Sequence, residues 1–278
     1  MPSAASVLGL DDVWFIEPFF SSLPDDYFTA VLLDLPGDQG RLLVDEESDP
    51  IALALCSEGQ WVAGSFHLRN PTATLIERFE ETAGDIYQED RAVWAAAVRD
   101  YYSRELMATI TPAMDDLNPG RIPLVASLLD QVWGIRKENT CLDCCCGSGI
   151  GSLVLRSRGI SPFSYDIDEG LLTCGLQTGR LLPEETMCID ATCAESYLGH
   201  APLGLGLMFG EINAFNRDLW KEITFALLDL TDEALITVGK QDEAELIGSW
   251  VSETDKQFRF FENERDLIYD RWVCVING

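Results

Sequence analysis

The sequence has 278 residues, of which 47% are hydrophobic and 24% are charged. This length is enough for one large domain or for two of ordinary size, and the composition is that of a folded globular protein. No apolar run reaches the roughly 18 uncharged residues that a membrane-spanning helix needs. The N-terminus lacks a basic region followed by an apolar core, so we expect no secretory signal. These features predict a cytoplasmic protein that does not enter a membrane.

The chain is strongly acidic, with 47 Asp and Glu against 19 Lys and Arg, a net charge of -28 and a pI near 4.1. Such a surface repels phosphate backbones, and the sequence contains no cluster of basic residues. A large nucleic-acid interface is therefore disfavoured. Solubility or a high-salt cytoplasm explains the acidity most simply, and attraction to a basic partner is the sharper alternative.

The cysteines could indicate disulfides or a metal, but their number and spacing favour neither. They are Cys56, Cys141, Cys144, Cys145, Cys146, Cys174, Cys188, Cys193 and Cys274. An odd number, with three adjacent in an apolar segment, fits a reducing compartment. Zinc would require a second C-x-x-C pair or nearby histidines, and a C-x3-C-x2-C cluster would require cysteine where Ser148 stands. We expect no metal.

The first part of the chain predicts a module of mixed α and β structure. Apolar runs at 29–35, 40–46, 51–57 and 61–68 are separated by turn-forming residues, which predicts an antiparallel meander. Residues 72–114 have apolar positions at helical spacing. Asn118, Pro119 and Gly120 then interrupt the pattern, so we place a domain boundary there, with one domain at 1–118 and another at 119–278.

The second part of the chain alternates helices with strands. A helix is expected near 123–133, a strand at 139–143, a glycine-containing loop and then a helix at 149–157. Further strands are expected at 163–166, 186–190, 203–209 and 234–238, with helices at 218–228 and 243–251. This alternation predicts an α/β fold with a mostly parallel sheet covered by helices on both faces. Two final strands, at 257–261 and 268–276, leave no room for a helix and predict a C-terminal antiparallel hairpin.

The segment LDCCCGSGIG at 142–151 carries the strongest signal for ligand binding. A strand ending in Asp143 leads through a loop with Gly147 and Gly149 into a helix, where free N–H groups and small residues let a ligand approach the backbone. Dinucleotide folds have G-x-G-x-x-G, and the third glycine is replaced here by Ser152. A carboxylate at Asp143 would repel a pyrophosphate but suits a ligand with an ammonium group, which argues against an NAD-dependent oxidoreductase.

Two further acidic residues end the next predicted strands. Asp166 lies 23 residues after Asp143, and Asp190 lies 24 residues after Asp166. Because carboxyl ends of parallel strands meet at one edge of the sheet, these side chains should gather where open α/β folds bind ligands. Asp166 could accept both ribose hydroxyls of a nucleoside, and Asp190 would be within reach of the base.

Together these motifs resemble those of the class I S-adenosylmethionine (SAM)-dependent methyltransferases. The resemblance covers about 140–278, with 142–149, 165–168 and 189–191 in the places of three family motifs, and the final hairpin is similar as well. It implies SAM as the cofactor, cradled by the backbone around Cys145, Cys146, Gly147 and Gly149. It further implies that Asp143 acts near the methionine amino group, directly or through water. Asp166 would bind the ribose, Ile167 would pack on adenine, and Asp190, followed by Ala191, would bond the adenine amino group.

The chain departs from the family pattern at two places. Cys145 stands where the family usually has glycine, and the fourth strand ends in FGEINAFN rather than the Asn-Pro-Pro-Tyr or Asp-Pro-Pro-Tyr of enzymes that methylate exocyclic nitrogens. Glu211 and Asn213 fall where the reacting centre should be. They could orient or deprotonate a nucleophile, or serve as loop residues or secondary cofactor contacts. No catalytic residue is assigned from the sequence.

The sequence thus predicts a SAM-dependent methyltransferase that acts on an unidentified small-molecule or protein acceptor. The N-terminal module would cover the sheet edge and select the acceptor. Two alternatives keep the fold: transfer of an aminopropyl or aminocarboxypropyl group, and a non-catalytic SAM-binding partner protein. The triple cysteine is interpreted as small buried side chains rather than a nucleophile, and Tyr101 and Tyr102 as helical core residues rather than a lid.

Overall fold

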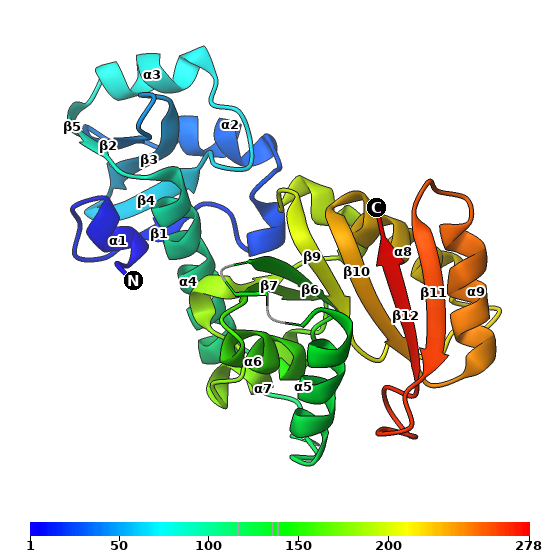
Figure 1. The fold of residues 1–278 in the computed structure, drawn as a ribbon. Coiled ribbons are helices and arrows are strands. Elements are labelled where there is room, and N and C mark those ends of the chain that lie inside the picture. The colour runs from blue at the N-terminus through cyan, green and yellow to red at the C-terminus, as the bar shows by residue number, and fades with distance from the viewer. Residues whose placement is uncertain (116, 135, 138) are drawn as a thin grey trace. The chain divides into compact units, whose positions relative to one another are not determined.

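The computed structural model describes residues 1–115, 117–134, 136–137 and 139–278 (Figure 1). The chain forms two compact units, Met1–Glu105 and Leu106–Gly278, here called the N-terminal and C-terminal units. The boundary expected near 118 falls inside the C-terminal unit, between two helices. Among the described residues, no helix combines the length and apolar character required to cross a membrane.

The N-terminal unit is a five-stranded sheet with helices. Its elements are α1 (Ala4–Val7), β1 (Trp14–Phe15), η1 (Phe20–Ser22), α2 (Tyr27–Leu33), β2 (Gln39–Val44), β3 (Pro50–Ser57), β4 (Gln60–Ser65), α3 (Ala73–Glu80), β5 (Ala83–Gln88) and α4 (Arg91–Thr109), which continues into the C-terminal unit. The strand order is β1-β4-β3-β2-β5. The antiparallel pairing of β2, β3 and β4 confirms the central part of the predicted meander. The two edge strands, β1 and β5, pair in parallel with their neighbours instead.

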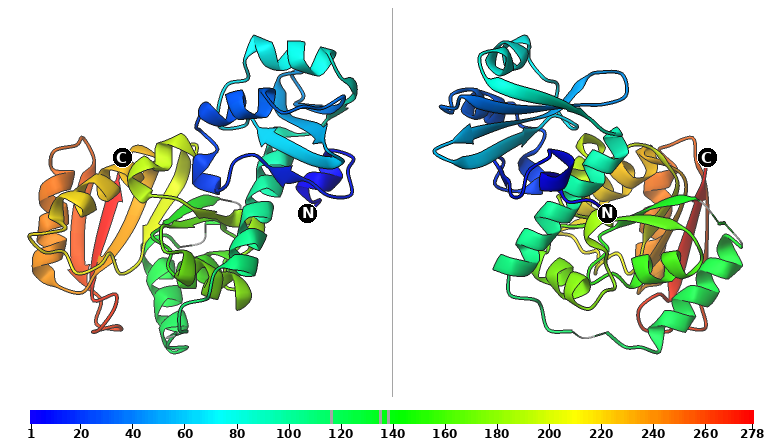
Figure 2. Two further views of the ribbon diagram at one scale, coloured as in Figure 1. Left: turned by 180° about the vertical axis from the view of Figure 1, so that it is seen from behind. Right: turned by 90° about the vertical axis from the view of Figure 1, so that its left-hand side faces the viewer.

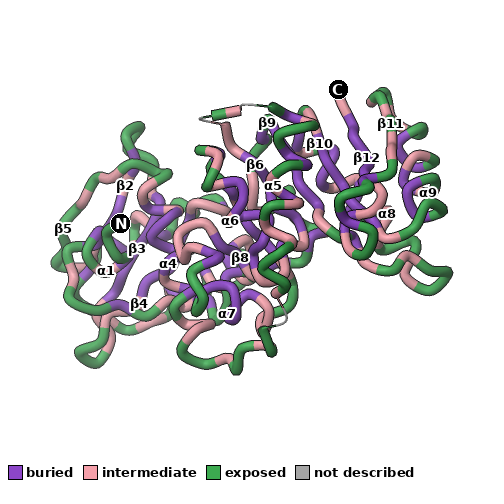
Figure 3. Tube along the Cα trace, turned by 60° about the horizontal axis from the view of Figure 1, so that its bottom comes forward, coloured by how far each residue is buried: buried purple, intermediate pink, exposed green. Residues whose placement is uncertain are grey.

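Two of the predicted elements in this unit were wrong. The run at 29–35 is part of helix α2, because its apolar residues serve a helix as well as a strand, and Leu32 packs into the core with Leu53 of β3. The predicted helix at 72–114 is interrupted by β5, whose backbone pairs with β2. Most residues of β5 are exposed, so it has no apolar alternation that could have revealed it (Figure 3).

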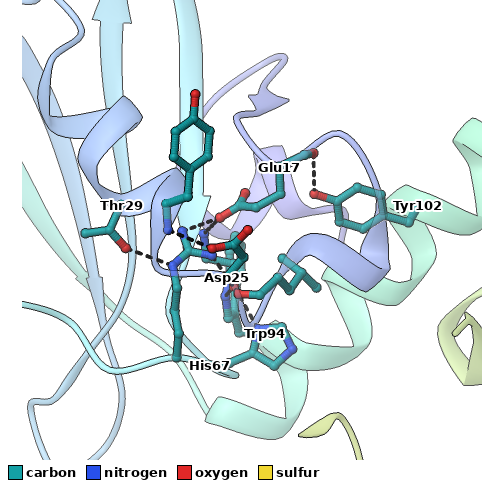
Figure 4. A network of polar contacts seen from close by, with 10 residues as sticks. Glu17, Asp25, Thr29, His67, Trp94 and Tyr102 are labelled. Atoms are coloured by element: carbon teal, nitrogen blue, oxygen red, sulfur yellow. Dashed lines mark hydrogen bonds and ion pairs between the residues drawn. The ribbon is translucent and has the colours of Figure 1, made fainter. Parts of the chain in front are cut away.

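A buried polar network ties the N-terminal unit together (Figure 4). Glu17 and Arg69 form an ion pair whose side chains are 0% and 1% exposed. Arg69 also donates from Nε to the Thr29 hydroxyl (3.0 Å), and the Tyr102 hydroxyl donates to the Glu17 carbonyl (2.9 Å). The network therefore joins the segment after β1, helix α2, the segment after β4 and helix α4. Tyr102 is a core residue of this unit.

The C-terminal unit is a seven-stranded sheet with helices on its two faces. Its elements are α5 (Arg121–Val132), β6 (Thr140–Cys144), α6 (Ile150–Ser157), β7 (Ser161–Asp166), α7 (Glu169–Gln177), η2 (Pro183–Glu185), β8 (Thr186–Cys188), η3 (Ala191–Ser196), β9 (Ala201–Gly206), α8 (Arg217–Asp229), β10 (Thr231–Val238), α9 (Gln241–Val251), β11 (Gln257–Glu262) and β12 (Trp272–Asn277). The strand order is β11-β12-β10-β9-β6-β7-β8. Figure 2 shows the fold from two further sides.

Strand direction confirms the prediction for this unit. β6 is parallel to β7 and β9, β7 to β8, and β9 to β10. β12 alone runs antiparallel to its neighbours β10 and β11, as expected of the closing hairpin.

The alternation of side chains in β9 shows why both faces are covered. Leu203 and Leu205 lie in one core cluster with Val125 of α5 and Val154 of α6. Gly204, between them, points the other way, and a Cβ there would lie 2.9 Å from Leu227 of α8. Successive residues of a strand face opposite sides, so the sheet lies between α5 and α6 on one face and α8 on the other.

The strand order also locates the edge where a ligand would bind. From β6 the chain passes to β7 and β8 on one side, while β9 and β10 lie on the other. The order of strands therefore reverses at β6. In open parallel sheets, ligands bind outside the carboxyl ends of the strands at such a reversal.

Candidate functional site

The loop from β6 to α6 has an unusual backbone. Cys145, Gly147 and Gly149 all have left-handed φ values, of 51°, 54° and 86°. Glycine adopts this conformation freely, whereas for a residue with a Cβ it is unfavourable by about 1–2 kcal/mol. Cys145 therefore takes a conformation that favours glycine, and the loop tolerates its side chain beside Cys144, with the two Sγ atoms 3.8 Å apart.

The two glycines of this loop serve different purposes. A Cβ on Gly149 would lie 2.6 Å from the side chain of Leu181, so glycine is required there for packing. A Cβ on Gly147 would meet no atom within 4 Å. The backbone at Gly147 thus borders open space, which is what close approach by a ligand needs.

Asp143 is buried beneath this loop. It is 1% exposed, and its Oδ2 accepts a hydrogen bond from the Ser152 hydroxyl at 2.5 Å. The Ser152 and Ser164 hydroxyl oxygens are 2.5 Å apart. Burial raises the pKa of Asp143 to about 6, although the hydrogen bonds from Ser152 act in the opposite direction. The carboxyl group is therefore directed at the first turn of α6, where it holds the strand, the loop and the helix together.

Asp166, at the end of β7, contacts the glycine loop directly. Its Oδ2 accepts the Gly147 N–H at 2.8 Å, and its Oδ1 accepts the Asp168 N–H at 2.9 Å. Burial raises the pKa of this carboxyl group. The next residue, Ile167, leaves 67% of its surface exposed, which is unusual for isoleucine. The first and second motifs therefore meet in space, with a bare apolar side chain beside them.

Asp190 and Ala191 lie at the next step along the same edge. The Ile189 N–H donates to the Asp166 carbonyl at 3.1 Å, which joins this segment to the end of β7. Asp190 is exposed and precedes η3, where its Oδ1 accepts from both the amide and the hydroxyl of Thr192. Ala191 is buried. The third motif thus adjoins the second, with its carboxylate at the surface.

Glu211 and Asn213 follow β9 in a loop that is bonded mainly to itself. The Glu211 side chain is 86% exposed, with Lys240 Nζ 3.7 Å away. The Asn213 side chain accepts the Phe215 N–H at 2.9 Å. The buried carboxylate of Glu243 in α9 accepts the Ile212 N–H at 3.1 Å and anchors the loop. Neither Glu211 nor Asn213 is held in the fixed geometry that a general base needs.

Sequence reasoning missed residues that support the loop from a distance. Arg180 is 6% exposed and donates from Nε to the Ser148 carbonyl at 2.8 Å, while its guanidinium pairs with Asp115 at 3.1 Å. Leu181 fills the space beside Gly149. Ser152 was noticed only as a missing glycine, although its hydroxyl binds Asp143. No local pattern marks Arg180 or Leu181, because each acts on residues about thirty positions away in the chain.

The cysteines of the loop are neutral thiols. Burial raises the pKa of Cys146, and a contact from the Cys144 thiol together with burial raises that of Cys145. A thiol with a raised pKa is a poor nucleophile, so packing remains the simpler interpretation. Within the described ranges, no three His, Cys, Asp or Glu side chains gather as metal ligands.

This edge of the sheet can therefore bind a nucleoside-like ligand. It combines open space at Gly147, a carboxylate that accepts the Gly147 N–H, a second acidic residue at the next strand and an exposed apolar side chain. Carboxylates that accept from backbone amides keep further lone pairs for ligand hydroxyl or amino groups.

Comparison with known proteins gave matches among solved structures. No protein-family model matches the chain, and no curated protein does so significantly. A magnesium protoporphyrin IX methyltransferase from Synechocystis PCC 6803 with bound SAM is 13% identical, with a TM-score of 0.45 over 66% of this chain and 97% of that one. An rRNA methylase from Streptococcus thermophilus is 16% identical, with a TM-score of 0.42 over 60% and 99%. A SAM-dependent methyltransferase from Archaeoglobus fulgidus is 14% identical, with a TM-score of 0.41 over 56% and 93%.

Strand order and strand direction define the fold of the C-terminal unit. A parallel sheet that reverses its order at β6 and closes with one antiparallel strand, β12, matches what the sequence motifs imply. The C-terminal unit has a Rossmann-like α/β fold that ends in an antiparallel hairpin.

Proposed function

We propose that the C-terminal unit binds SAM at the carboxyl ends of β6, β7 and β8 and transfers its methyl group to a small-molecule or protein acceptor. The observation that carries this proposal is the hydrogen bond from the Gly147 amide to Asp166, at a glycine that borders open space. This hydrogen bond connects the glycine loop, which is suited to the amino-acid part of SAM, with the Asp166 carboxylate, which is suited to the ribose hydroxyls.

The residues present fit the parts of SAM. The backbone of Cys145–Gly149 would hold the methionyl part, and Asp166 would accept the ribose hydroxyls. The exposed Ile167 side chain would pack on the adenine ring, and the surface carboxylate of Asp190 would accept its amino group. Asp143, which bonds to Ser152, would act on the methionyl part through the loop that it supports.

Methyl transfer from SAM requires mainly that the protein align the acceptor with the methyl group. SAM, when bound, supplies an activated methyl group on its sulfonium. The chain would then contribute orientation of the acceptor and exclusion of water. A general base is needed only where the acceptor carries a proton at its reacting atom, and Glu211, whose side chain is 86% exposed, is the carboxylate to test for that role.

The acidic surface favours an acceptor other than nucleic acid. The net charge is -28, and some of the arginines at the surface are paired with carboxylates, such as Arg271 with Glu262 and Arg136 with Glu233. Paired guanidinium groups are less available to phosphates. We infer an acceptor that is neutral or cationic.

Calorimetry with SAM and S-adenosylhomocysteine tests the cofactor. We expect both to bind, and Asp166→Asn to weaken binding at least tenfold because it removes the charge and one acceptor oxygen. Asp229→Asn is the matched control, since Asp229 is an exposed carboxylate at the end of α8. Folded protein that binds neither compound would refute the proposal.

Product analysis separates the possible reactions. Mass spectrometry of candidate acceptors incubated with SAM distinguishes a transferred methyl from an aminopropyl or aminocarboxypropyl group. Formation of S-adenosylhomocysteine supports methyl transfer. Cofactor binding without turnover on any acceptor would support the non-catalytic alternative instead.

A further inference from the structure

The N-terminal unit contains a hollow of about 500 Å³ that is lined by residues of this unit alone. We call it the tryptophan hollow, after Trp14 and Trp61, which line it together with Arg41, Asp11 and Asp12. A volume of this order is typical of small-molecule sites. Its lining combines two indole rings, a guanidinium group and two carboxylates.

A stack of side chains holds Arg41 in place at the hollow. The guanidinium carbon lies 5.2 Å from the centre of the Trp61 ring and 5.9 Å from that of Tyr87. The Tyr87 ring in turn packs so closely on Gly9 that a Cβ there would be 2.7 Å away. Strand register explains the stack, because Arg41 pairs with Asp85 and Leu43 with Tyr87, so that Arg41 and Tyr87 share a face.

The hydrogen bonds of Arg41 are incomplete. Its Nη1 bonds the Gly40 carbonyl at 3.1 Å and pairs with Asp85 at 3.0 Å. Its Nε is buried without an acceptor, and among the described residues none accepts from Nη2. Buried donors are normally satisfied, and arginine uses its planar set of donors to bind carboxylates. No ligand in the hollow can reach the buried Nε, whereas Nη2 is not buried and is free to donate to an anionic group of a ligand.

The opposite charge is also available in the hollow. Asp11 and Asp12 are exposed, and neither forms an ion pair with any residue in the part of the chain that the structure describes. Trp14 leaves 54% of its surface exposed at the same place. A cation is attracted both to unpaired carboxylates and to an open indole face.

A ligand that meets all these groups must carry an anionic group, a cationic group and an apolar part. We propose that the tryptophan hollow binds a free α-amino acid with an aromatic or aliphatic side chain. Its carboxylate pairs with Arg41, its ammonium group with Asp11 and Asp12, and its side chain packs on the indole of Trp14. This site belongs wholly to the N-terminal unit and does not depend on the proposed methyl transfer.

The experiment uses the full chain and isothermal titration calorimetry. The probes are L-phenylalanine and L-leucine, compared with phenethylamine, which lacks the carboxylate, and 3-phenylpropionate, which lacks the ammonium group. We expect one amino acid to bind per chain, and each phenylalanine analogue to bind at least tenfold more weakly. The result that overturns the proposal is failure of both amino acids to bind below about 10 mM, or binding of phenethylamine as tight as that of phenylalanine.

Variants locate the binding. Arg41→Gln should remove the preference for phenylalanine over phenethylamine. The double variant, with Asp11→Asn and Asp12→Asn, should remove the preference for phenylalanine over 3-phenylpropionate. Asp34→Asn, an exposed carboxylate that does not line the hollow, should change neither. If circular dichroism shows that Arg41→Gln is unfolded, Trp14→Ala replaces it, since 54% of the Trp14 surface is exposed, and we expect at least a tenfold loss of binding. Unchanged binding in the folded variants would place the amino acid elsewhere and refute the site.

Discussion

At the scale of single residues, two glycines in one loop lead to a paired prediction. Gly149→Ala combines a left-handed backbone with a Cβ 2.6 Å from Leu181, so we expect a loss of about 2–4 kcal/mol in the free energy of unfolding. Gly147→Ala adds only the backbone term of about 1–2 kcal/mol, because its Cβ meets open space.

The effects of the two variants on SAM binding should have the reverse order. The Cβ of Gly147→Ala would project where a ligand approaches the backbone, so this variant should lose SAM binding at least tenfold while remaining folded. Urea denaturation and calorimetry on the two variants measure both effects. Equal losses of stability would contradict the packing cost at Gly149, and unchanged SAM binding by Gly147→Ala would show that the open space at Gly147 has no role.

Asp143 leads to a prediction on pH dependence. Its pKa is raised from 3.8 to about 6 in the folded state, so the native protein binds this proton more tightly than the unfolded chain does. The contribution of Asp143 to stability is therefore greatest below pH 4 and declines as the pH rises through 6. At about 1.4 kcal/mol per pKa unit, the decline is roughly 3 kcal/mol.

Asp143→Asn removes this titration and keeps an oxygen that can accept from Ser152. The unfolding free energy of the wild type relative to the variant should therefore fall between pH 4 and pH 7. Amide hydrogen exchange in β6 and α6 measures it at the site itself. A difference that does not vary with pH would mean that Asp143 is charged throughout this range.

At the scale of elements, the ion pair of Glu17 and Arg69 holds together parts of the N-terminal unit that are distant in sequence. Arg69→Met leaves the buried Glu17 carboxylate without its partner, so we expect it to destabilise the unit by about 3–5 kcal/mol. Burial raises the pKa of Glu17 and Arg69 lowers it, so the variant should also become more stable, relative to the wild type, as the pH falls.

A double variant tests whether the cost comes from the unpaired charge. Glu17→Met with Arg69→Met removes both charges, and apolar replacement of a buried pair is often close to neutral. We expect it to regain most of the stability, as measured by urea denaturation monitored through tryptophan fluorescence. If the double variant is no more stable than Arg69→Met, the bonds of Arg69 to Thr29 and Leu23 carry the effect instead.

At the scale of the whole molecule, a net charge of -28 predicts a response to salt. Repulsion among surface carboxylates destabilises the compact state, and salt shortens the Debye length from about 30 Å at 0.01 M to about 3 Å at 1 M. We expect the Tm at pH 8 to rise by several degrees between low salt and 1 M KCl. The rise should shrink as the pH approaches the pI of about 4.1, where repulsion disappears. A Tm that falls with salt at pH 8 would contradict this.

The two units differ in how far their folds could be predicted. In the C-terminal unit, strands alternate with helices along the chain, and this order of elements leaves few topologies open. In the N-terminal unit, α2 has an apolar run that also fits a strand, and β5 is an exposed edge strand with no apolar alternation. Pairing of β5 with β2 forms through the backbone, which no side-chain pattern records.

The sequence by itself determined the glycine loop at the end of one strand and the acidic residues that end or follow the next two, because strand spacing and the parallel sheet bring such positions to one edge. Only the tertiary structure decided that Asp143 turns inward to Ser152 while Asp166 reaches Gly147. It also decided that Arg180 supports the loop across 32 residues of sequence, and that Arg41 lies between Trp61 and Tyr87. The physical reason is that spacing along the chain specifies which edge or face a residue occupies, whereas its partners depend on packing between elements that are distant in sequence.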